Sequence, residues 1–142
     1  MNIIIDGDGT SGIKIIETLA QKYNISVSIY HDYSHNITSE YSSIHKLDTA
    51  FQNVDIAISN IVKENDIVIT NDYGLALMVL SKKAIPIKDN GFIFTKDNID
   101  NLIYIKYVNQ KQRKQNHHIK GPKKRKVDDD KSLIENLEKL LN

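Results

Sequence analysis

Residues 2–10 read Asn-Ile-Ile-Ile-Asp-Gly-Asp-Gly-Thr, and residues 66–76 read Asp-Ile-Val-Ile-Thr-Asn-Asp-Tyr-Gly-Leu-Ala. Each stretch holds a short run of β-branched apolar residues, then an aspartate, and then the start of a helical pattern. A continuous apolar run of this length is typical of a strand that is buried on both faces of a parallel sheet. The two stretches therefore predict two strand-to-helix units of an α/β fold.

The flanking sequence continues the same alternation. Apolar residues recur at three- and four-residue spacing from Ser11, the expected N-cap, to about Tyr23, which predicts a helix. Further strands are expected at 25–30, 43–47 and 85–87, with a last extended piece at 92–94, and further helices at 54–62, 74–82, 97–107 and 129–141. In the last helix the inward residues are expected to be Leu133, Ile134, Leu137, Leu140 and Leu141. We expect a mostly parallel central sheet between two helical layers.

Length and composition narrow the class of protein. With 142 residues, 40% hydrophobic and 26% charged, residues 1–142 suit a single globular domain. No apolar run approaches the roughly 20 residues that cross a bilayer, and the amino terminus lacks a secretory pattern, so we expect a cytoplasmic protein that does not insert into membranes. The absence of cysteine excludes disulfides and thiolate ligands, which leaves oxygen and imidazole ligands for any metal.

The positive charge is concentrated near the carboxyl terminus. Residues 101–142 hold 11 of the 19 Lys and Arg but only 5 of the 18 Asp and Glu, and no acid interrupts the basic segment 106–126. Such a segment suits either a solvated linker or a surface for polyanions, where phosphate contacts release counterions. On the second interpretation, the nucleic-acid contacts come from Arg113, Lys114, Lys120, Lys123, Lys124, Arg125 and Lys126.

Acidic residues follow the expected strands. Asp6 and Asp8 follow the first strand and Asp72 follows strand 66–70, so all three are expected at the carboxyl edge of the sheet, where α/β folds bind ligands. Any one of them could be an ordinary helix cap. Together they indicate a site for Mg²⁺ or Mn²⁺, because carboxylates that converge repel one another unless a cation lies between them. Asp55 can point toward the same edge, and Asp48 is a further candidate, whereas Asp66 begins its strand and is expected at the opposite edge.

Several of these motifs together resemble the small bacterial YaiI/YqxD family. They are Ile5-Asp6-Gly7-Asp8, the stretch 66–76, the pair Asn98-Ile99, and Gly121-Pro122-Lys123 ahead of a leucine-rich helix. The resemblance implies a PIN-like fold and a nuclease-like site in which Asp6, Asp8, Asp55 and Asp72 bind Mg²⁺ or Mn²⁺. It implies no established substrate.

The chain departs from the family pattern near these acids. Gly9-Thr10-Ser11 replaces Ala-Cys-Pro after the second aspartate, and Asn71 replaces a glutamine before Asp72. An arginine that usually follows the Asn-Ile helix is replaced near Lys106 or displaced to Arg113. These departures concern contacts to substrate more than the acids themselves.

A second resemblance gives an alternative function. Asp6-Gly7-Asp8-Gly9-Thr10 is similar to the first motif of haloacid dehalogenase phosphatases, in which Asp6 would be the nucleophile and Asp8 the general acid. That chemistry also needs a strand-end hydroxyl, a lysine and a later acidic pair. Thr70 and Lys83 could serve, but the run 128–130 follows the basic segment and no strand.

Three functions therefore stay open from the sequence. They are a metal-dependent nuclease acting on RNA or DNA, a nucleic-acid-binding protein without catalysis, and a phosphatase. The five histidines are scattered and do not form a zinc-binding pattern. The choice between RNA and DNA, between endo- and exonuclease action, and the oligomeric state are not encoded in any of these motifs.

Overall fold

The computed structural model describes residues 1–32, 36–48, 53–116 and 124–142, with the backbone alone at 114–116. The strands are β1 (Ile3–Asp6), β2 (Val27–Asp32), β3 (Ser43–Leu47), β4 (Ile67–Ile69) and β5 (Ile85–Ile87). The helices are α1 (Ile13–Lys22), α2 (Val54–Ile61), α3 (Tyr73–Ser81), α4 (Lys96–Asn116) and α5 (Val127–Leu141).

The five strands form one parallel sheet in the order β3-β2-β1-β4-β5. The strand β1 lies in the middle, and Ile5 is in register with Ile29 of β2 and Ile69 of β4. The isoleucines of β1 are between 0% and 3% exposed, because helices cover both faces of the sheet. A central strand buried on both sides explains why its sequence is continuously apolar.

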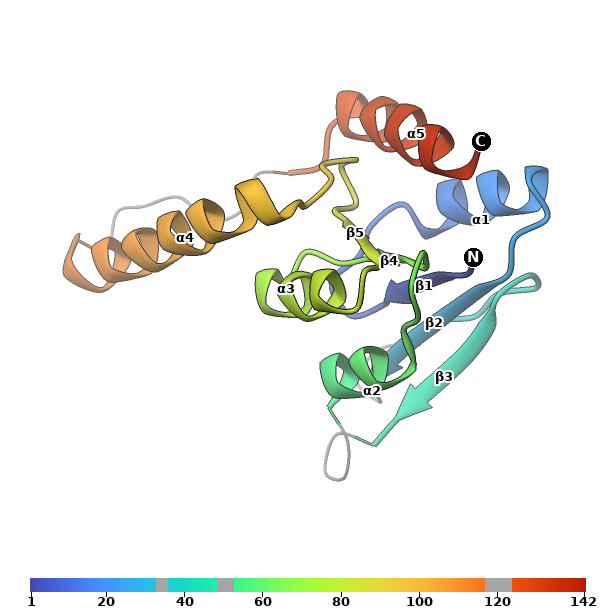
Figure 1. Ribbon diagram of the computed structural model, residues 1–142, viewed down its shortest axis with the longest axis horizontal. Helices are drawn as coiled ribbons and strands as arrows, with labels where there is room; N and C mark the ends of the chain where they lie inside the picture. Colours follow the sequence, from blue (N-terminus) through green and yellow to red (C-terminus); the bar gives the residue numbers. More distant parts are fainter. Residues whose placement is uncertain (33–35, 49–52, 117–123) are drawn as a thin grey trace.

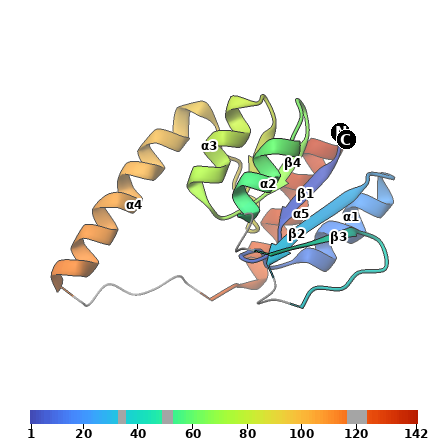
Figure 2. The same cartoon turned by 90° about the horizontal axis from the view of Figure 1, so that it is seen from below.

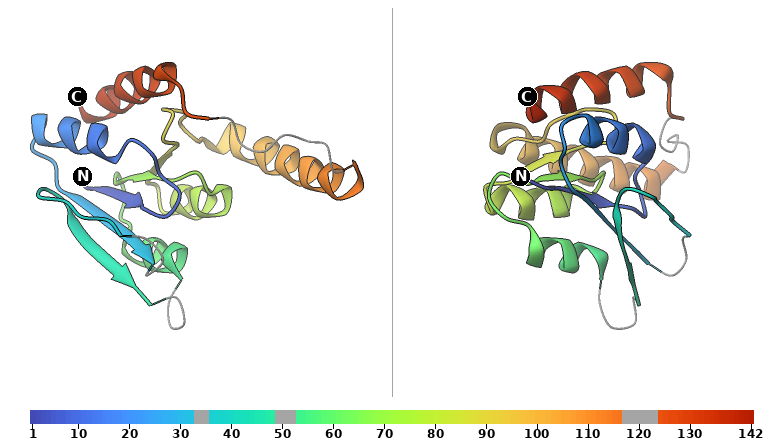
Figure 3. Two further views of the ribbon diagram at one scale, coloured as in Figure 1. Left: turned by 180° about the vertical axis from the view of Figure 1, so that it is seen from behind. Right: turned by 90° about the vertical axis from the view of Figure 1, so that its right-hand side faces the viewer.

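Helices cover both faces of the sheet in three layers (Figure 1). On one face Ile3 and Ile5 pack with Ile16 of α1 and with Leu133 and Leu137 of α5. On the other face, Ile4 and Val68 pack with apolar side chains of α2 and α3. The helices α1 and α5 lie side by side, seen from behind and from the side in Figure 3. This arrangement confirms the α/β class and the mostly parallel sheet predicted from the sequence.

The first half of the basic segment is helical, which corrects the prediction of a linker after residue 107. Helix α4 continues to Asn116, and its second half extends away from the sheet (Figure 2). The apolar spacing stops near Tyr107, but the lysines, glutamines and arginine that follow are good helix formers, and no glycine or proline interrupts them. In the described part of the chain, no helix is both long enough and apolar enough to cross a membrane.

Three smaller predictions also change. The N-cap of α1 is Gly12, at a positive φ of 75°, and not Ser11, whose backbone N–H instead donates to Asp89. Ile134, expected to face inward, is 39% exposed because it lies at the edge of the apolar stripe of α5. The extended piece at 92–94 is reduced to a single antiparallel bridge between Ile93 and Ile87.

Candidate functional site

The structure brings the four predicted aspartates to the carboxyl edge of the sheet. Asp6 is the last residue of β1, and Asp8 follows in the next loop. Asp72 follows β4 as the N-cap of α3, and Asp55 lies in the first turn of α2. The strand β1 is directly paired with β4, so the loops that carry Asp6, Asp8 and Asp72 are neighbours. Asp48 follows the outermost strand, β3, two strands away from β1.

Thr70 connects two of these acids. Its fully buried hydroxyl donates to Oδ2 of Asp6 at 3.0 Å, and Oγ1 of Thr70 also accepts the backbone N–H of Asp72 at 3.0 Å. A hydroxyl both donates and accepts, so it holds the two loops at a defined separation. Asp72 also caps α3, since its Oδ1 accepts the N–H of Leu75 at 3.1 Å. Oδ1 of Asp8 accepts the N–H of Asp32 at 3.1 Å, which ties the β1 loop to β2.

Two of these carboxyls, Asp6 and Asp55, have raised pKa values. Burial raises the pKa of Asp6, the hydrogen bond from Thr70 opposes that rise, and the charges of Asp8 and Asp72 add to it. Burial, followed by the charges of Asp72 and Asp6, raises the pKa of Asp55 to about 6, and a hydrogen bond with Asp72 contributes as well. Burial and neighbouring negative charges therefore both disfavour the ionised forms of Asp6 and Asp55.

The donor chemistry of this cluster suits a hard divalent cation, because carboxylate oxygens are the ligands that Mg²⁺ and Mn²⁺ prefer. The described residues nevertheless contain no group of three or more His, Asp or Glu side chains already placed to hold a metal ion. Oδ1 of Asp8 and Oδ1 of Asp72 both accept backbone hydrogen bonds. Each of these carboxylates also has a second oxygen, Oδ2. The charge and the ligand atoms of the cluster therefore suit a divalent cation, whereas the described side chains are not yet arranged around one.

The raised pKa of Asp55 predicts how stability depends on pH. The pKa of Asp55 in the folded protein, about 6, lies above the ordinary value of 3.8. The contribution of this carboxyl to the free energy of unfolding is therefore fully present below pH 4 and is lost as pH rises through 6. Asp55→Asn should remove this loss, which is roughly 1–2 kcal/mol for a partly exposed carboxyl. Urea unfolding without metal at several pH values measures it.

Asp97→Asn is the matched control for this change, because Asp97 is also an acid in the first turn of a helix. Both substitutions remove a favourable interaction with the helix dipole, but Asp97 is exposed on α4. Equal pH profiles for the two variants would contradict the raised pKa of Asp55.

A cavity of about 930 Å³ adjoins the acidic cluster. Its walls include Gly9 and Asn71, which are the sequence neighbours of Asp8 and Asp72. The other walls come from the turn after β5, from α4 and from the start of α5. Its cationic lining residues are Lys88, Lys106, Arg113, Lys124, Arg125 and Lys126, and its acidic ones are Asp89 and Asp129. A positively charged cavity beside a cluster of carboxylates suits a phosphate-containing ligand.

Four residues of the predicted nucleic-acid surface line this cavity: Arg113, Lys124, Arg125 and Lys126. The side chain of Lys114 and the whole of Lys120 and Lys123 lie outside the described residues. The contacts of these residues with nucleic acid stay a prediction.

Asp89 is a residue that the sequence prediction missed. It follows β5, so the rule that located Asp6 and Asp72 at strand ends could have found it. Its Oδ2 accepts the N–H of Ser11 at 2.8 Å and Nδ2 of Asn71 at 3.0 Å. Its Oδ1 lies 3.6 Å from Nη1 of Arg125. Asp89 therefore connects the loops after β1, β4 and β5 to the start of α5.

Two salt bridges orient Arg125 in the cavity wall. Besides the contact with Asp89, its Nε donates to Oδ1 of Asp130 at 2.7 Å, and its side chain is 24% exposed. Two carboxylates on one guanidinium restrict its rotation, so Arg125 is held in place before any ligand binds.

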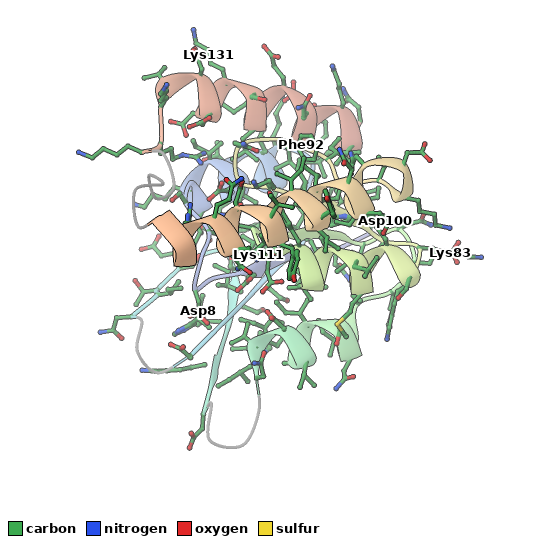
Figure 4. The ribbon with its side chains drawn as sticks, turned by 90° about the vertical axis from the view of Figure 1, so that its left-hand side faces the viewer. Asp8, Lys83, Phe92, Asp100, Lys111 and Lys131 are labelled. Atoms are coloured by element: carbon green, nitrogen blue, oxygen red, sulfur yellow. The ribbon has the colours of Figure 1, made fainter. Side chains whose placement is uncertain are left out.

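Lys83 and the acidic run 128–130 do not lie where a haloacid dehalogenase phosphatase would need them. Lys83 lies at the amino edge of the sheet, where its backbone carbonyl accepts the N–H of Asn65 at 3.1 Å, and it is far from Asp8 (Figure 4). Asp66 lies at that same edge, as predicted, and accepts the N–H groups of Asn2 and Lys63. The run 128–130 forms the first turn of α5. Thr70 alone of the supporting groups reaches Asp6.

The chain is similar in sequence to several bacterial UPF0178 proteins. The chain is 45% identical over 141 residues to a UPF0178 protein of Clostridium perfringens, covering 99% of this chain and 95% of the relative. It is 44% identical to a UPF0178 protein of Clostridium kluyveri, covering 99% and 93%, and 41% identical to one of Lachnoclostridium phytofermentans, covering 99% and 97%. No solved structure matches.

A family model described as "Uncharacterized BCR, YaiI/YqxD family" matches residues 4–142. The match includes all four aspartates of the cluster and every cationic residue that lines the cavity. The chain therefore belongs to the YaiI/YqxD family, as its strand-end aspartates and its Gly-Pro-Lys motif implied.

Proposed function

We propose that this protein is a metal-dependent nuclease, which hydrolyses phosphodiester bonds of RNA or DNA at the acidic cluster. The observation that carries the proposal is that the chain neighbours of Asp8 and Asp72, which are Gly9, Asn71 and Tyr73, line the cationic cavity. A cavity with this charge attracts a phosphate backbone, and the neighbouring carboxylates attract the cation that phosphodiester chemistry uses.

Each residue has a defined part in this proposal. Asp6, Asp8, Asp55 and Asp72 would hold Mg²⁺ or Mn²⁺, which when bound supplies a nucleophilic water and neutralises the charge that develops on the phosphate. Thr70 keeps Asp6 and Asp72 at a fixed separation through its hydroxyl. Lys88, Lys106 and Arg125 carry positive charge into the cavity and would hold the flanking phosphates.

One observation favours a second function, a nucleic-acid-binding protein without catalysis. Among the described residues no metal-binding group is preformed, and Asp8 and Asp72 each already make a structural hydrogen bond. In that protein the acids would stabilise loops and the cavity would bind nucleic acid on its own. The two functions differ in what a metal ion does.

Incubation of the purified chain with single- and double-stranded RNA and DNA in Mn²⁺, beside a generic phosphomonoester, tests the proposal. We expect cleavage of a nucleic acid, no turnover of the monoester, and no activity when a chelator is present. A binding protein would cleave nothing. A phosphatase would turn over the monoester and retain beryllium fluoride on Asp6.

A thermal-unfolding measurement tests the metal without relying on activity. A cation that binds only the folded protein stabilises it by about 2.7 kcal/mol at 100 times its Kd, so Mn²⁺ should raise the unfolding midpoint. Asp72→Asn should abolish that rise. A midpoint that is independent of Mn²⁺ in the native chain would contradict a metal site at this cluster.

A further inference from the structure

Two lysines from different elements converge on one tyrosine ring inside the cavity. Nζ of Lys88, in the turn after β5, and Nζ of Lys106, on α4, each lie 5.3 Å from the centroid of the Tyr73 ring. All three residues line the cavity beside the acidic cluster. Lys106 begins the basic segment 106–126 but was not among the predicted nucleic-acid contacts, and Lys88 lies outside that segment.

The ring that holds these lysines is itself fixed. Tyr73 packs edge-on against Phe94, with ring centroids 5.4 Å apart and an interplanar angle of 69°, and Phe94 is only 1% exposed. The negative face of an aromatic ring attracts an ammonium group electrostatically. Tyr73 therefore restricts both flexible lysine side chains to positions beside its ring.

Lys88 and Lys106 form no salt bridge within the described part of the chain. Among the residues that the structure describes, no carboxylate lies within ion-pair distance of Lys88 or Lys106. Arg125, by contrast, is paired with both Asp89 and Asp130. Two ammonium groups that share a ring and lack a counterion are stabilised by an anion that contacts both.

The position of the ring indicates which anion. Tyr73 directly follows Asp72, so the two lysines lie next to the cluster at which phosphodiester cleavage is proposed. A phosphodiester strand whose one phosphate lies at the carboxylates would present the next phosphate along the strand to this part of the cavity. Lysine binds phosphate as a point charge, without the planar geometry that arginine requires.

We propose that Lys88 and Lys106 bind one phosphate adjacent to the scissile one, and that Tyr73 is the residue that positions them. The identity of the ligand as a nucleic-acid strand rests on the proposed function. The pair would set the register of the strand against Asp72, so it would affect binding of the strand before any chemistry takes place.

The test measures binding without cleavage, using fluorescence anisotropy of a labelled single-stranded oligonucleotide in chelator at several salt concentrations. Lys88→Gln and Lys106→Gln should each weaken binding about tenfold, and each should reduce the slope of log K against log salt by about 0.7. Lys82→Gln is the matched control, because Lys82 is an exposed lysine at the opposite end of α3 from Tyr73.

Substitutions at Tyr73 separate positioning from charge. Tyr73→Phe keeps the ring and should bind like the native chain, whereas Tyr73→Leu keeps both lysines but removes the ring and should weaken binding several-fold. Thermal midpoints of both variants verify that they are folded. Equal binding by Tyr73→Leu and Tyr73→Phe would overturn the positioning role of the ring.

The outcomes for this phosphate site and for the nuclease are distinct. If the double lysine variant has native Kd and salt slope, or if Lys82→Gln weakens binding equally, the phosphate site is wrong even when the chain cleaves nucleic acid. If binding depends on the lysines but no nucleic acid is cleaved in Mn²⁺, the nuclease is wrong and the phosphate site stands.

Discussion

Asp72→Asn and Asp6→Asn should each reduce Mn²⁺-dependent cleavage of nucleic acid at least about 100-fold, which corresponds to a loss of about 3 kcal/mol of transition-state stabilisation. The expected loss is large because both carboxylates would be ligands of the same cation, so neither can replace the other. Binding of nucleic acid in chelator should be unchanged or slightly tighter, since the cationic cavity is intact and one negative charge near the phosphates is gone.

These substitutions change charge with little change of structure. Asparagine at 72 keeps Oδ1, which accepts the N–H of Leu75, so α3 stays capped. Asparagine at 6 keeps an oxygen that can accept the hydroxyl of Thr70. Without metal, both variants should be as stable as the native chain or more so, because a repulsion among the aspartates has been removed.

Asp100→Asn is the control for the acid variants. Asp100 is exposed on α4, and the substitution removes the same charge at a position away from Asp8 (Figure 4). It should cleave at the native rate. Cleavage that persists equally in the Asp6 and Asp72 variants would show that a contaminating nuclease is responsible, and these residues would lose their assigned role.

Gly91→Ala should destabilise the protein by about 2–4 kcal/mol, the second large effect we expect. Gly91 has a φ of +91°, and a Cβ there would lie 2.4 Å from the carbonyl oxygen of Ser132 in α5. The carbonyl of Gly91 also accepts Nδ2 of Asn136 at 2.8 Å. Alanine would therefore strain the turn and push α5 away from the sheet, partly exposing Leu133.

Gly9→Ala is the matched control, because a Cβ at Gly9 would have no atom within 4 Å. Its free energy of unfolding should stay within about 0.5 kcal/mol of the native value in urea. A native-like stability for Gly91→Ala would mean that α5 does not pack on this turn as closely as the structure places it. Because Arg125 precedes α5, the Gly91 variant should also weaken binding in the cavity.

Local sequence patterns were enough to predict the strands, most of the helices and the position of Asp6, Asp8 and Asp72 at one edge of the sheet. The isoleucines at 3–5 and the run Ile67-Val68-Ile69 predict buried strands from local composition alone. In a parallel sheet every such strand ends at the same edge, so Asp6, Asp8 and Asp72 could be placed together before any packing was known. The same rule placed Asp66 at the opposite edge, where it lies.

Local patterns failed where the apolar spacing was weak. Helix α4 runs nine residues past the end of its predicted range because its polar residues favour helix without showing an amphipathic period. The N-cap of α1 is Gly12 and not Ser11, whose backbone N–H donates to Asp89, far along the chain. A contact across 78 residues has no signal in the sequence around Ser11.

The way in which the residues at the carboxyl edge combine into a site depends on packing between elements. Asp55 acquires a pKa of about 6 because the packing of α2 against the sheet buries it beside Asp72. Lys88 and Lys106 meet on Tyr73 because α3, α4 and the turn after β5 surround one cavity. Periodicity reports which face of an element is buried, whereas distances between elements depend on strand order and helix packing, which no single segment encodes.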